Sequence, residues 1–527
     1  MKRNTPTYFI IKSWYKLYVL AIFCCLPFIF NFLWGNHDWG WIKEYTPLTS
    51  GLFEGRFSQF IIPILLFSGN ILPVFSLMTG LAFLSLAAVL TLNLWQTPKK
   101  NYIYLLLGLN IIIAPYTISW FYFAFLTLSC LTWPVIIIAG FIALATNSFK
   151  KTYTIPLATL LFSLALGGYP PVINMIGVIL FTLIINDIYQ NEITIKKYIP
   201  HAIAIIGAIA ILLIIQHFLK LHHWQYDTYN TAHIDLNNLK DKFSLCFKTS
   251  FKQLTRTTSF ISCFYKYTTL SLCLIALWEL WQKISKKPLN IICLILSLCG
   301  LLLSTTLTLF AAENTVYVIY EPRIDFYSLP YIYTFAGSII FRSKIKFIKN
   351  ITLSALFLVC LYNLNTITYA QKVWTFGFKT ETAMMERIIN RLEDHPQFSP
   401  YRNYTFAQSG SLNFRQKYYQ LKSNETIDSY TLFAPYIPWQ KPSKAFTFYY
   451  PQTFINNDFD IFWWFVSKES LPITPEFKQY IYKKSAPWPH KNSLYVDSSL
   501  IALTLTSDGE NMARQWFDKN ISRGNTK

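Results

Sequence analysis

The feature that most constrains this chain is a series of apolar segments, each about as long as a bilayer is thick, separated by short polar connections. An α-helix rises about 1.5 Å per residue, so it needs roughly 20 apolar residues to cross the hydrocarbon core. Segments of suitable length occupy residues 17–34, 71–95, 102–118, 122–147, 153–168, 170–189, 200–219, 266–282, 289–311, 326–341 and 351–369. We therefore expect an α-helical polytopic membrane protein with about 11 transmembrane helices.

The composition agrees with a lipid bilayer as the surroundings of this chain. Only 14% of its 527 residues are charged and 53% are hydrophobic, whereas soluble chains carry about 25% charged residues. The same figures exclude disorder, collagen and coiled coils. The nine cysteines lie almost entirely in apolar segments without metal-binding or CxxC spacing, so no disulfide framework is expected. Cys246 and Cys263 could pair across an outer loop, although two free thiols are the favoured alternative.

The net charge of +20 is distributed in short basic clusters between the apolar segments. Alternate connections carry Lys99 and Lys100, Lys150 and Lys151, Lys196 and Lys197, Lys283 to Lys287, and Arg342 to Lys349. Together with the basic N-terminus, these clusters fall on one side, which the positive-inside rule makes cytoplasmic. We therefore interpret the first apolar segment, residues 17–34, as an uncleaved signal-anchor. We expect a bacterial inner-membrane protein with a cytoplasmic N-terminus and an extracytoplasmic C-terminus, and no nucleic-acid partner, because no base-reading motif accompanies the charge.

The chain divides into two expected domains, a transmembrane domain at 1–370 and an extracytoplasmic α+β domain at 371–527. The second part is charged and contains no apolar run long enough to span. Apolar residues at helical spacing predict a helix at 381–392. Short stretches rich in β-formers follow, at 404–407, 445–450 and 493–496.

A further amphipathic segment lies in the outer loop between residues 220 and 266. Leu236, Leu239, Phe243, Phe247, Phe251 and Leu254 recur at helical spacing between four lysines. This pattern predicts either a helix in the outer lipid interface or a loop helix packed on the spans, and the two readings stay open.

Most candidate site residues also lie in the expected outer loops. Asp38 follows the first span beside Trp39, and a carboxylate next to aromatic rings can act as a general base on a sugar stacked there. The alternative is a solvated acid beside an interfacial aromatic belt. Arg56 could clamp a phosphate or only extend to the interface. Glu321, Arg323 and Asp325 precede a late span, where they could hold an anionic lipid head or form a local ion-pair network.

Two negative observations narrow the chemistry further. His217, His222, His223 and Asp227 match no standard metal spacing, so no metal site is predicted. The spans show no mid-membrane carboxylate and no basic side chain within the bundle, which disfavours ion-coupled transport and flippase activity.

Several of these segments together resemble the bacterial type II glucosyltransferases that modify O-antigen. The similar segments are the Asp38 loop ending in Glu54-Gly55-Arg56-Phe57, the corner Gly167-Gly168-Tyr169-Pro170-Pro171, Pro322-Arg323 before a late span, and Phe378 to Glu393 followed by Tyr404-Thr-Phe-Ala. The family more usually has Gln where Pro170 stands. The resemblance implies a GT-C type membrane glycosyltransferase that passes a hexose, typically glucose, from a polyprenyl-phosphate carrier to a glycan acceptor.

The resemblance also suggests roles for the candidate residues. Asp38 would be the general base, and Glu44 a second carboxylate if the reaction retained the anomeric configuration. Arg56 and Arg323 would hold the donor phosphate, while Trp39, Tyr169 and Glu321 would contact substrate. No cofactor is predicted with certainty, and a divalent metal is an open alternative for holding the phosphate charge. The competing readings are a flippase, transporter or polymerase of lipid-linked sugars.

Overall fold

The protein is described by a computed structural model that divides into two compact units. The residues described are 6–31, 51–52, 54–121, 124–145, 151–224, 239–257, 261–284, 288–311, 322–402, 404–409, 455–460, 474–505 and scattered positions between 507 and 518. The described residues up to Gln371 belong to the first unit, and those from Lys372 onward belong to the second. The domain boundary expected after residue 370 lies beside this division.

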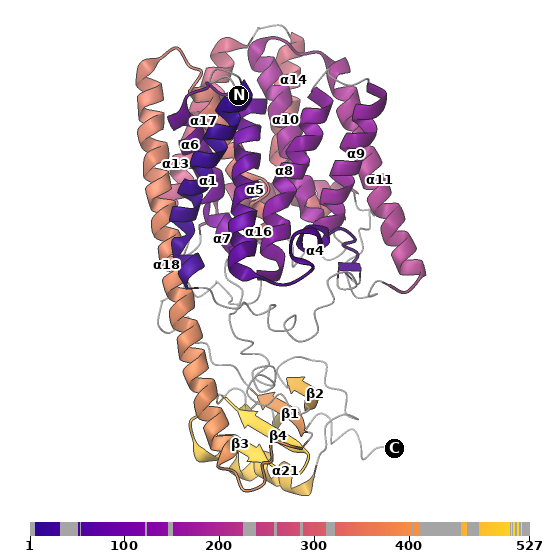
Figure 1. The fold of residues 1–527 in the computed structure, drawn as a ribbon, viewed down its shortest axis with the longest axis vertical. Helices are drawn as coiled ribbons and strands as arrows, with labels where there is room; N and C mark the ends of the chain where they lie inside the picture. Colours follow the sequence, from indigo (N-terminus) through magenta and orange to yellow (C-terminus); the bar gives the residue numbers. More distant parts are fainter. Residues whose placement is uncertain are drawn as a thin grey trace. The chain divides into compact units, whose positions relative to one another are not determined.

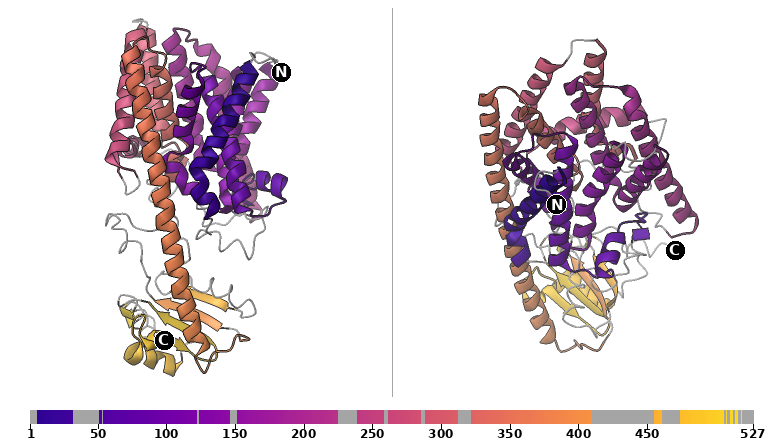
Figure 2. Two further views of the ribbon diagram at one scale, coloured as in Figure 1. Left: turned by 60° about the vertical axis from the view of Figure 1, so that its left-hand side comes forward. Right: turned by 45° about the horizontal axis from the view of Figure 1, so that its top comes forward.

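The first unit is a bundle of α-helices that run in alternating directions between two ends (Figure 1). Its long helices are α1 (Pro6–Phe30), α5 (Pro73–Leu94), α6 (Asn101–Ile112), α8 (Ala124–Ala145), α9 (Lys151–Gly168), α10 (Ile173–Gln190), α11 (Ile199–Leu221), α13 (Cys263–Lys283), α14 (Pro288–Ser304), α17 (Leu329–Ile340) and the start of α18 (Lys346–Glu393). The helices lie side by side in each view (Figure 2). Shorter elements are α4 (Ile61–Phe67), η1 (Pro115–Thr117), α7 (Ile118–Phe121), η2 (Pro170–Val172), η3 (Ile195–Tyr198), α12 (Leu239–Thr255), α15 (Thr308–Ala311) and α16 (Pro322–Asp325).

Among the described residues, six helices are long and apolar enough to cross a membrane. They cover Thr7–Phe30, Pro73–Leu94, Leu126–Ala145, Pro170–Gln190, Lys196–Leu221 and Lys346–Lys372. The pair Asn101–Ile112 and Pro115–Phe121, bent by 45°, makes a seventh if it is one span. The architecture is therefore that of a helical membrane protein, although length and composition alone identify fewer crossings than the eleven expected from sequence.

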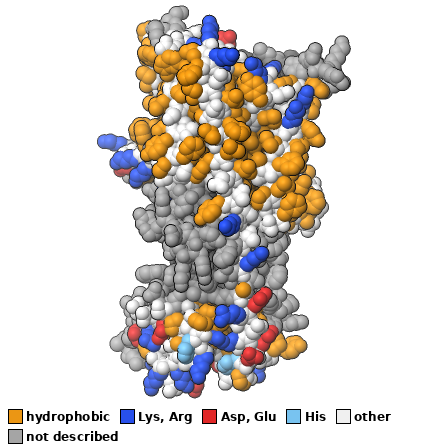
Figure 3. Space-filling view, turned by 90° about the vertical axis from the view of Figure 1, so that its left-hand side faces the viewer, with side chains coloured by type: hydrophobic (Ala, Val, Ile, Leu, Met, Phe, Trp, Pro, Cys, Tyr) orange, Lys and Arg blue, Asp and Glu red, His pale blue; other side chains and the backbone are white. Residues whose placement is uncertain are grey.

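The surface of the bundle has the character expected of a protein surrounded by lipid. Ile206 and Ile214 on α11 are 66% and 68% exposed, and Phe357 on α18 is 55% exposed. A helix that is apolar on its outer face as well as its inner face is typical of a membrane span. Hydrophobic side chains cover most of the visible flank of this unit (Figure 3).

The helices α6, α11 and α18 begin at the same end of the bundle (Figure 1), and each follows one of the described basic clusters, Lys99 and Lys100, Lys196 and Lys197, or Arg342 to Lys346. There the Lys197 ammonium donates to the Asp187 carboxylate at 2.6 Å. The Arg342 guanidinium donates to the amide oxygen of Asn186 at 2.7 Å. Both contacts anchor a basic residue to the end of α10.

The second unit contains a four-stranded sheet in the order β2-β1-β4-β3. Its strands are β1 (Tyr404–Ser409), β2 (Ile455–Asp460), β3 (Leu494–Val496) and β4 (Leu500–Thr504). β1 pairs in parallel with β2 and β4, and β3 pairs antiparallel with β4. Ile388, Ile389 and Leu392 near the end of α18 pack with strand residues in one core. The strands predicted at 404–407 and 493–496 coincide with β1 and β3, whereas 445–450 lies outside the described residues.

One element is longer than the sequence suggests. The span predicted at 351–369 and the separate helix predicted at 381–392 are parts of the single helix α18. No proline interrupts this stretch, and Gly377 alone costs a helix only about 1 kcal/mol. The change from apolar to polar composition therefore marks a change of surroundings along one helix rather than its end.

Candidate functional site

The candidate site lies at the other end of the bundle, where three chain segments break their helical path. The breaks are η1 and α7 after α6, η2 after α9, and α16 before α17. Prolines stand at the first position of η1, η2 and α16, since the ring fixes φ and needs no amide donor there. α16 contacts η1 and α7, so segments distant in sequence meet at this end.

Arg56 is held in place at this end by its neighbours. The Arg56 guanidinium pairs with the Glu54 carboxylate at 2.7 Å, and the two side chains are 23% and 19% exposed. The guanidinium carbon also lies 5.3 Å from the centre of the Tyr169 ring. Gly55, with φ of 69°, provides the turn that sets Arg56 beside Glu54. A cation held over an aromatic face is attracted by the ring quadrupole and is oriented before any ligand arrives.

Tyr169 belongs to a buried aromatic wall behind Arg56. Its ring lies 5.1 Å from Trp120 and 5.8 Å from Tyr327, measured between centroids. Tyr169 is 5% exposed, and the other two are fully buried. The Tyr327 hydroxyl donates to the Cys130 carbonyl at 3.0 Å, which fixes the wall to α8. In this position the Tyr169 ring supports Arg56 more directly than it offers a face to a sugar.

The aromatic wall also joins the Arg56 loop to the segment that carries Arg323. Tyr327 follows α16 in the chain and contacts Tyr169, so α16 lies on the same side of the bundle as Arg56. Arg323 is in α16, and its side chain lies outside the described residues. Asp38, Trp39, Glu44 and Glu321 likewise lie outside the described residues. The structure thus brings together Tyr169, Arg56 and the backbone around Arg323.

Lys266 is a buried cation of this end that sequence reasoning missed. It lies on the first turn of α13 and is only 3% exposed. Its ammonium donates to the Tyr116 hydroxyl of η1 at 2.6 Å and to the Gln253 carbonyl of α12. The expectation of no basic side chain within the bundle is therefore wrong at this position. A lysine at the start of an apolar run is typical of an interface residue, so only the tertiary contacts identify it.

Asp325 provides the negative charge near Lys266. Its Oδ1 atom is buried and has no hydrogen-bond partner among the described residues. Burial raises the pKa of this carboxyl, while the Lys266 ammonium and the Arg256 guanidinium act to lower it. Asp325 lies outside the apolar helix α17, at the end of α16. A buried carboxylate beside two cations can position charged groups or exchange a proton with a ligand.

No metal centre is visible in the described part of the chain, where no three His, Cys, Asp or Glu side chains come together. Cys246 and Cys263 are both free thiols. Cys246 is buried against the carbonyl of Thr306, with its sulfur at 3.7 Å from that oxygen. The pairing of these two cysteines, considered from sequence, is not present.

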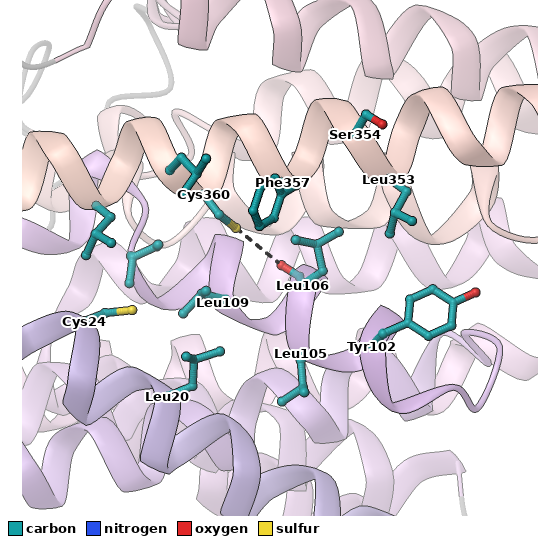
Figure 4. A pocket seen from close by; sticks show the side chains of 13 residues that line it. Leu20, Cys24, Tyr102, Leu105, Leu106, Leu109, Leu353, Ser354, Phe357 and Cys360 are labelled. Carbon is teal, nitrogen blue, oxygen red and sulfur yellow. Dashed lines mark hydrogen bonds between the residues drawn. The ribbon is translucent and has the colours of Figure 1, made fainter.

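An apolar groove of about 690 Å³ lies on the flank of the bundle between α1, α6 and α18 (Figure 4). Leu20 and Cys24 line it from α1, and Phe357 and Cys360 line it from α18. The Cys360 thiol points to the Leu106 carbonyl of α6. The lining is almost entirely hydrocarbon, which suits an acyl or isoprenoid chain and no polar ligand.

Comparison with known proteins gives no further guide: no family model matches this chain, and no curated protein or solved structure is significantly similar to it.

Proposed function

We propose that this protein is a membrane glycosyltransferase that moves a hexose from a polyprenyl-phosphate carrier to a surface glycan such as O-antigen. The observation that carries the proposal is the Arg56 guanidinium, held between the Glu54 carboxylate and the Tyr169 ring. That ring contacts Tyr327, which follows the segment of Arg323 in the chain. The reaction releases a lipid phosphate, whose charge needs preorganised cations. Arg56 and Arg323 are the proposed donor-phosphate ligands, since a guanidinium binds a phosphate through two parallel hydrogen bonds.

In this proposal Asp38 takes the proton of the acceptor hydroxyl as that oxygen attacks the anomeric carbon. One base and direct displacement would invert the anomeric centre, whereas retention would require a second carboxylate such as Glu44. Trp39 and Glu321 are proposed to contact the sugars. Tyr169 acts by orienting Arg56, in keeping with its burial.

The proposed membrane arrangement has eleven crossings. We take as crossings the six long apolar helices, the bent pair, the three shorter apolar helices and α13. With the basic clusters inside, the candidate site and the C-terminal α+β unit would both be extracytoplasmic in a bacterial inner membrane. The apolar groove between α1, α6 and α18 supports a long-chain lipid as the donor.

Replacement of Arg56 tests the proposal most directly. Arg56→Ala should lower hexose transfer from polyprenyl-phosphate hexose to the glycan by at least about 10²-fold, since it removes a cation aimed at the leaving phosphate. Arg56→Lys should retain part of the activity, because it keeps the charge but loses the planar fork. Lys99→Ala, an exposed lysine at the other end of the bundle, is the matched control and should transfer normally.

The transfer would be measured with purified enzyme and by mass spectrometry of surface glycans. Normal transfer by Arg56→Ala, with normal protein levels, would exclude Arg56 from phosphate binding. Loss of transfer in Asp38→Asn with unchanged membrane insertion would support its role as the base.

A flippase for lipid-linked sugars is the second candidate, and the buried Lys266 ammonium favours it, because basic side chains within a bundle can pass an anionic head. The two functions give different products. Reconstituted vesicles containing only the lipid-linked sugar would show its movement between leaflets for a flippase, whereas a transferase would require the glycan and form a new glycosidic bond.

A further inference from the structure

The helix α12 has two faces of unusual chemistry for a loop helix. Its inner face is small and polar, and packs against the end of α14 and against α15. The Ser250 and Thr306 hydroxyls are hydrogen-bonded at 2.9 Å, and the Thr306 hydroxyl also donates to the Cys246 carbonyl at 3.2 Å. The Lys242 ammonium donates to the Phe310 carbonyl at 3.1 Å. Polar contacts therefore hold α12 on the bundle.

The outer face of α12 is aromatic. Phe243, Phe247 and Phe251 follow one another at four-residue spacing and are 46%, 44% and 54% exposed. Three phenylalanines on one face of a 17-residue helix would be unfavourable in contact with water. Because the inner face is occupied by polar contacts, these half-exposed rings favour an apolar environment outside the bundle.

The charges beside these phenylalanines indicate which apolar environment fits this helix. Lys240, Lys248 and Lys252 are exposed on the same helix, where Asp241 is the one acidic residue. Lysines that flank an aromatic face are the signature of a helix lying in a lipid interface, with the rings among acyl chains and the ammonium groups at phosphates. A protein partner would not require that pattern.

The position of α12 in the chain agrees with an interface. It precedes α13, and the Lys266 ammonium on the first turn of α13 donates to the Gln253 carbonyl at the end of α12 and to the Tyr116 hydroxyl of η1. The helix is therefore fixed at the level where α13 begins and α14 ends, which is the level of a membrane surface if these helices cross.

We propose that α12 lies in the lipid–water interface and binds anionic phospholipid, with Phe243, Phe247 and Phe251 in the acyl region and Lys240, Lys248 and Lys252 at the phosphates. The site does not depend on the proposed transferase activity. It makes α12 a lipid-binding surface of the bundle, held to the broken path of α6 and α7 through Lys266.

The depth of nitroxide labels in the bilayer, measured at neighbouring positions of α12, tests the contact with lipid. A variant in which all nine cysteines are replaced would carry one new cysteine, at Phe247 or Lys248, labelled with a nitroxide in nanodiscs. The probe at 247 should be relaxed by oxygen, which concentrates in lipid, and the probe at 248 by a water-soluble nickel chelate. Phe251→Cys is a second lipid-facing position in case the first variant does not fold. A probe at 247 that is open to water, or shielded from both relaxants by protein, would overturn the proposal.

The dependence of thermal stability on the lipid headgroup tests the role of the three lysines. The thermal midpoint of the full chain should be higher in nanodiscs with phosphatidylglycerol than with phosphatidylcholine. The triple variant Lys240→Gln, Lys248→Gln and Lys252→Gln should lose most of that difference. The matched control is Lys478→Gln, Lys483→Gln and Lys484→Gln, three exposed lysines of the second unit, which should keep it. Equal loss in both triple variants would mean a general charge effect and would contradict a site on α12.

Discussion

At the scale of single residues, the contacts of Lys266 are the least expected feature of the bundle. Its ammonium joins α13 to η1 and to the end of α12, and lies in the electrostatic field of Asp325. Burying an ammonium costs several kcal/mol unless hydrogen bonds and an opposite charge compensate for it. The arrangement therefore makes Lys266 and Asp325 depend on each other.

This dependence predicts strong non-additivity. Lys266→Met should destabilise the protein by about 3–5 kcal/mol, since it removes one of the two cations that act on the buried Asp325 carboxylate. In the Lys266→Met background, Asp325→Asn should restore part of the loss, because the buried carboxyl group is then replaced by a neutral amide. The measurement is the thermal unfolding, in one detergent, of the unmodified protein, the two single variants and the double variant. Lys99→Met is the control at an exposed lysine. Additive effects of the two changes would show that the pair is not coupled.

The residue scale also shows how far a sequence can identify a site. Arg56 and Tyr169 could be selected because each stands in a polar or glycine-rich corner between apolar segments. Their contact across more than 100 residues could not be predicted, since it depends on the packing of α9 against the loop before α4. Lys266 gave no signal at all, because burial at a span end is decided by neighbouring elements and not by local sequence.

At the scale of elements, close backbone packing determines where the corners of the bundle lie. A Cβ atom on Gly168 would come within 2.0 Å of the Trp133 ring, which is 1% exposed and cannot move aside. On Gly207 the nearest atom, in the Thr159 side chain, would be at 3.1 Å. The corner that presents Tyr169 therefore requires glycine at 168, while a methyl group at 207 needs only a shift of a few tenths of an ångström by the Thr159 side chain.

The two glycines predict opposite results for one substitution. Gly168→Ala should destabilise the protein by about 1–3 kcal/mol through overpacking against α8. Gly207→Ala should be neutral or slightly stabilising, because alanine favours a helix interior over glycine. Thermal unfolding of both variants gives the comparison. If Gly168→Ala were as stable as Gly207→Ala, the packing of α9 on Trp133 would be looser than the structure indicates.

The ends of helices could be predicted from sequence where glycine or proline interrupts the chain, and not elsewhere. The corner Gly167-Gly168-Tyr169-Pro170-Pro171 separates α9 from α10 as its composition indicates. α18 continues beyond its apolar part because residues 370–380 contain no proline, so hydropathy alone placed its end too early. The strands β2 and β4 were not predicted, since each is short and pairs with β1, which is distant in sequence.

At the scale of the whole molecule, the number of crossings depends on the short helix α17. Its 12 residues span only about 18 Å, less than the roughly 30 Å of a hydrocarbon core. Yet Tyr327 before it contacts Tyr169 at the candidate site, and the Ser338 hydroxyl near its end is hydrogen-bonded to Thr97 at 2.6 Å, beside the basic cluster of Lys99 and Lys100. α17 with its flanking turns therefore connects the two ends of the bundle, as a crossing must.

Counting α17 as a crossing fixes the side of everything that follows it, so topology is the test of the whole arrangement. Reporter fusions after Lys100, Lys151 and Lys287 should be cytoplasmic, and fusions after Tyr229 and Lys527 should be exterior, because basic clusters are retained inside. If α17 did not cross, the start of α18 would lie outside and the C-terminus inside. A cytoplasmic reporter at Lys527 with an exterior one at Tyr229 would thus place the error between them and remove the C-terminal unit from the side of the proposed acceptor glycan.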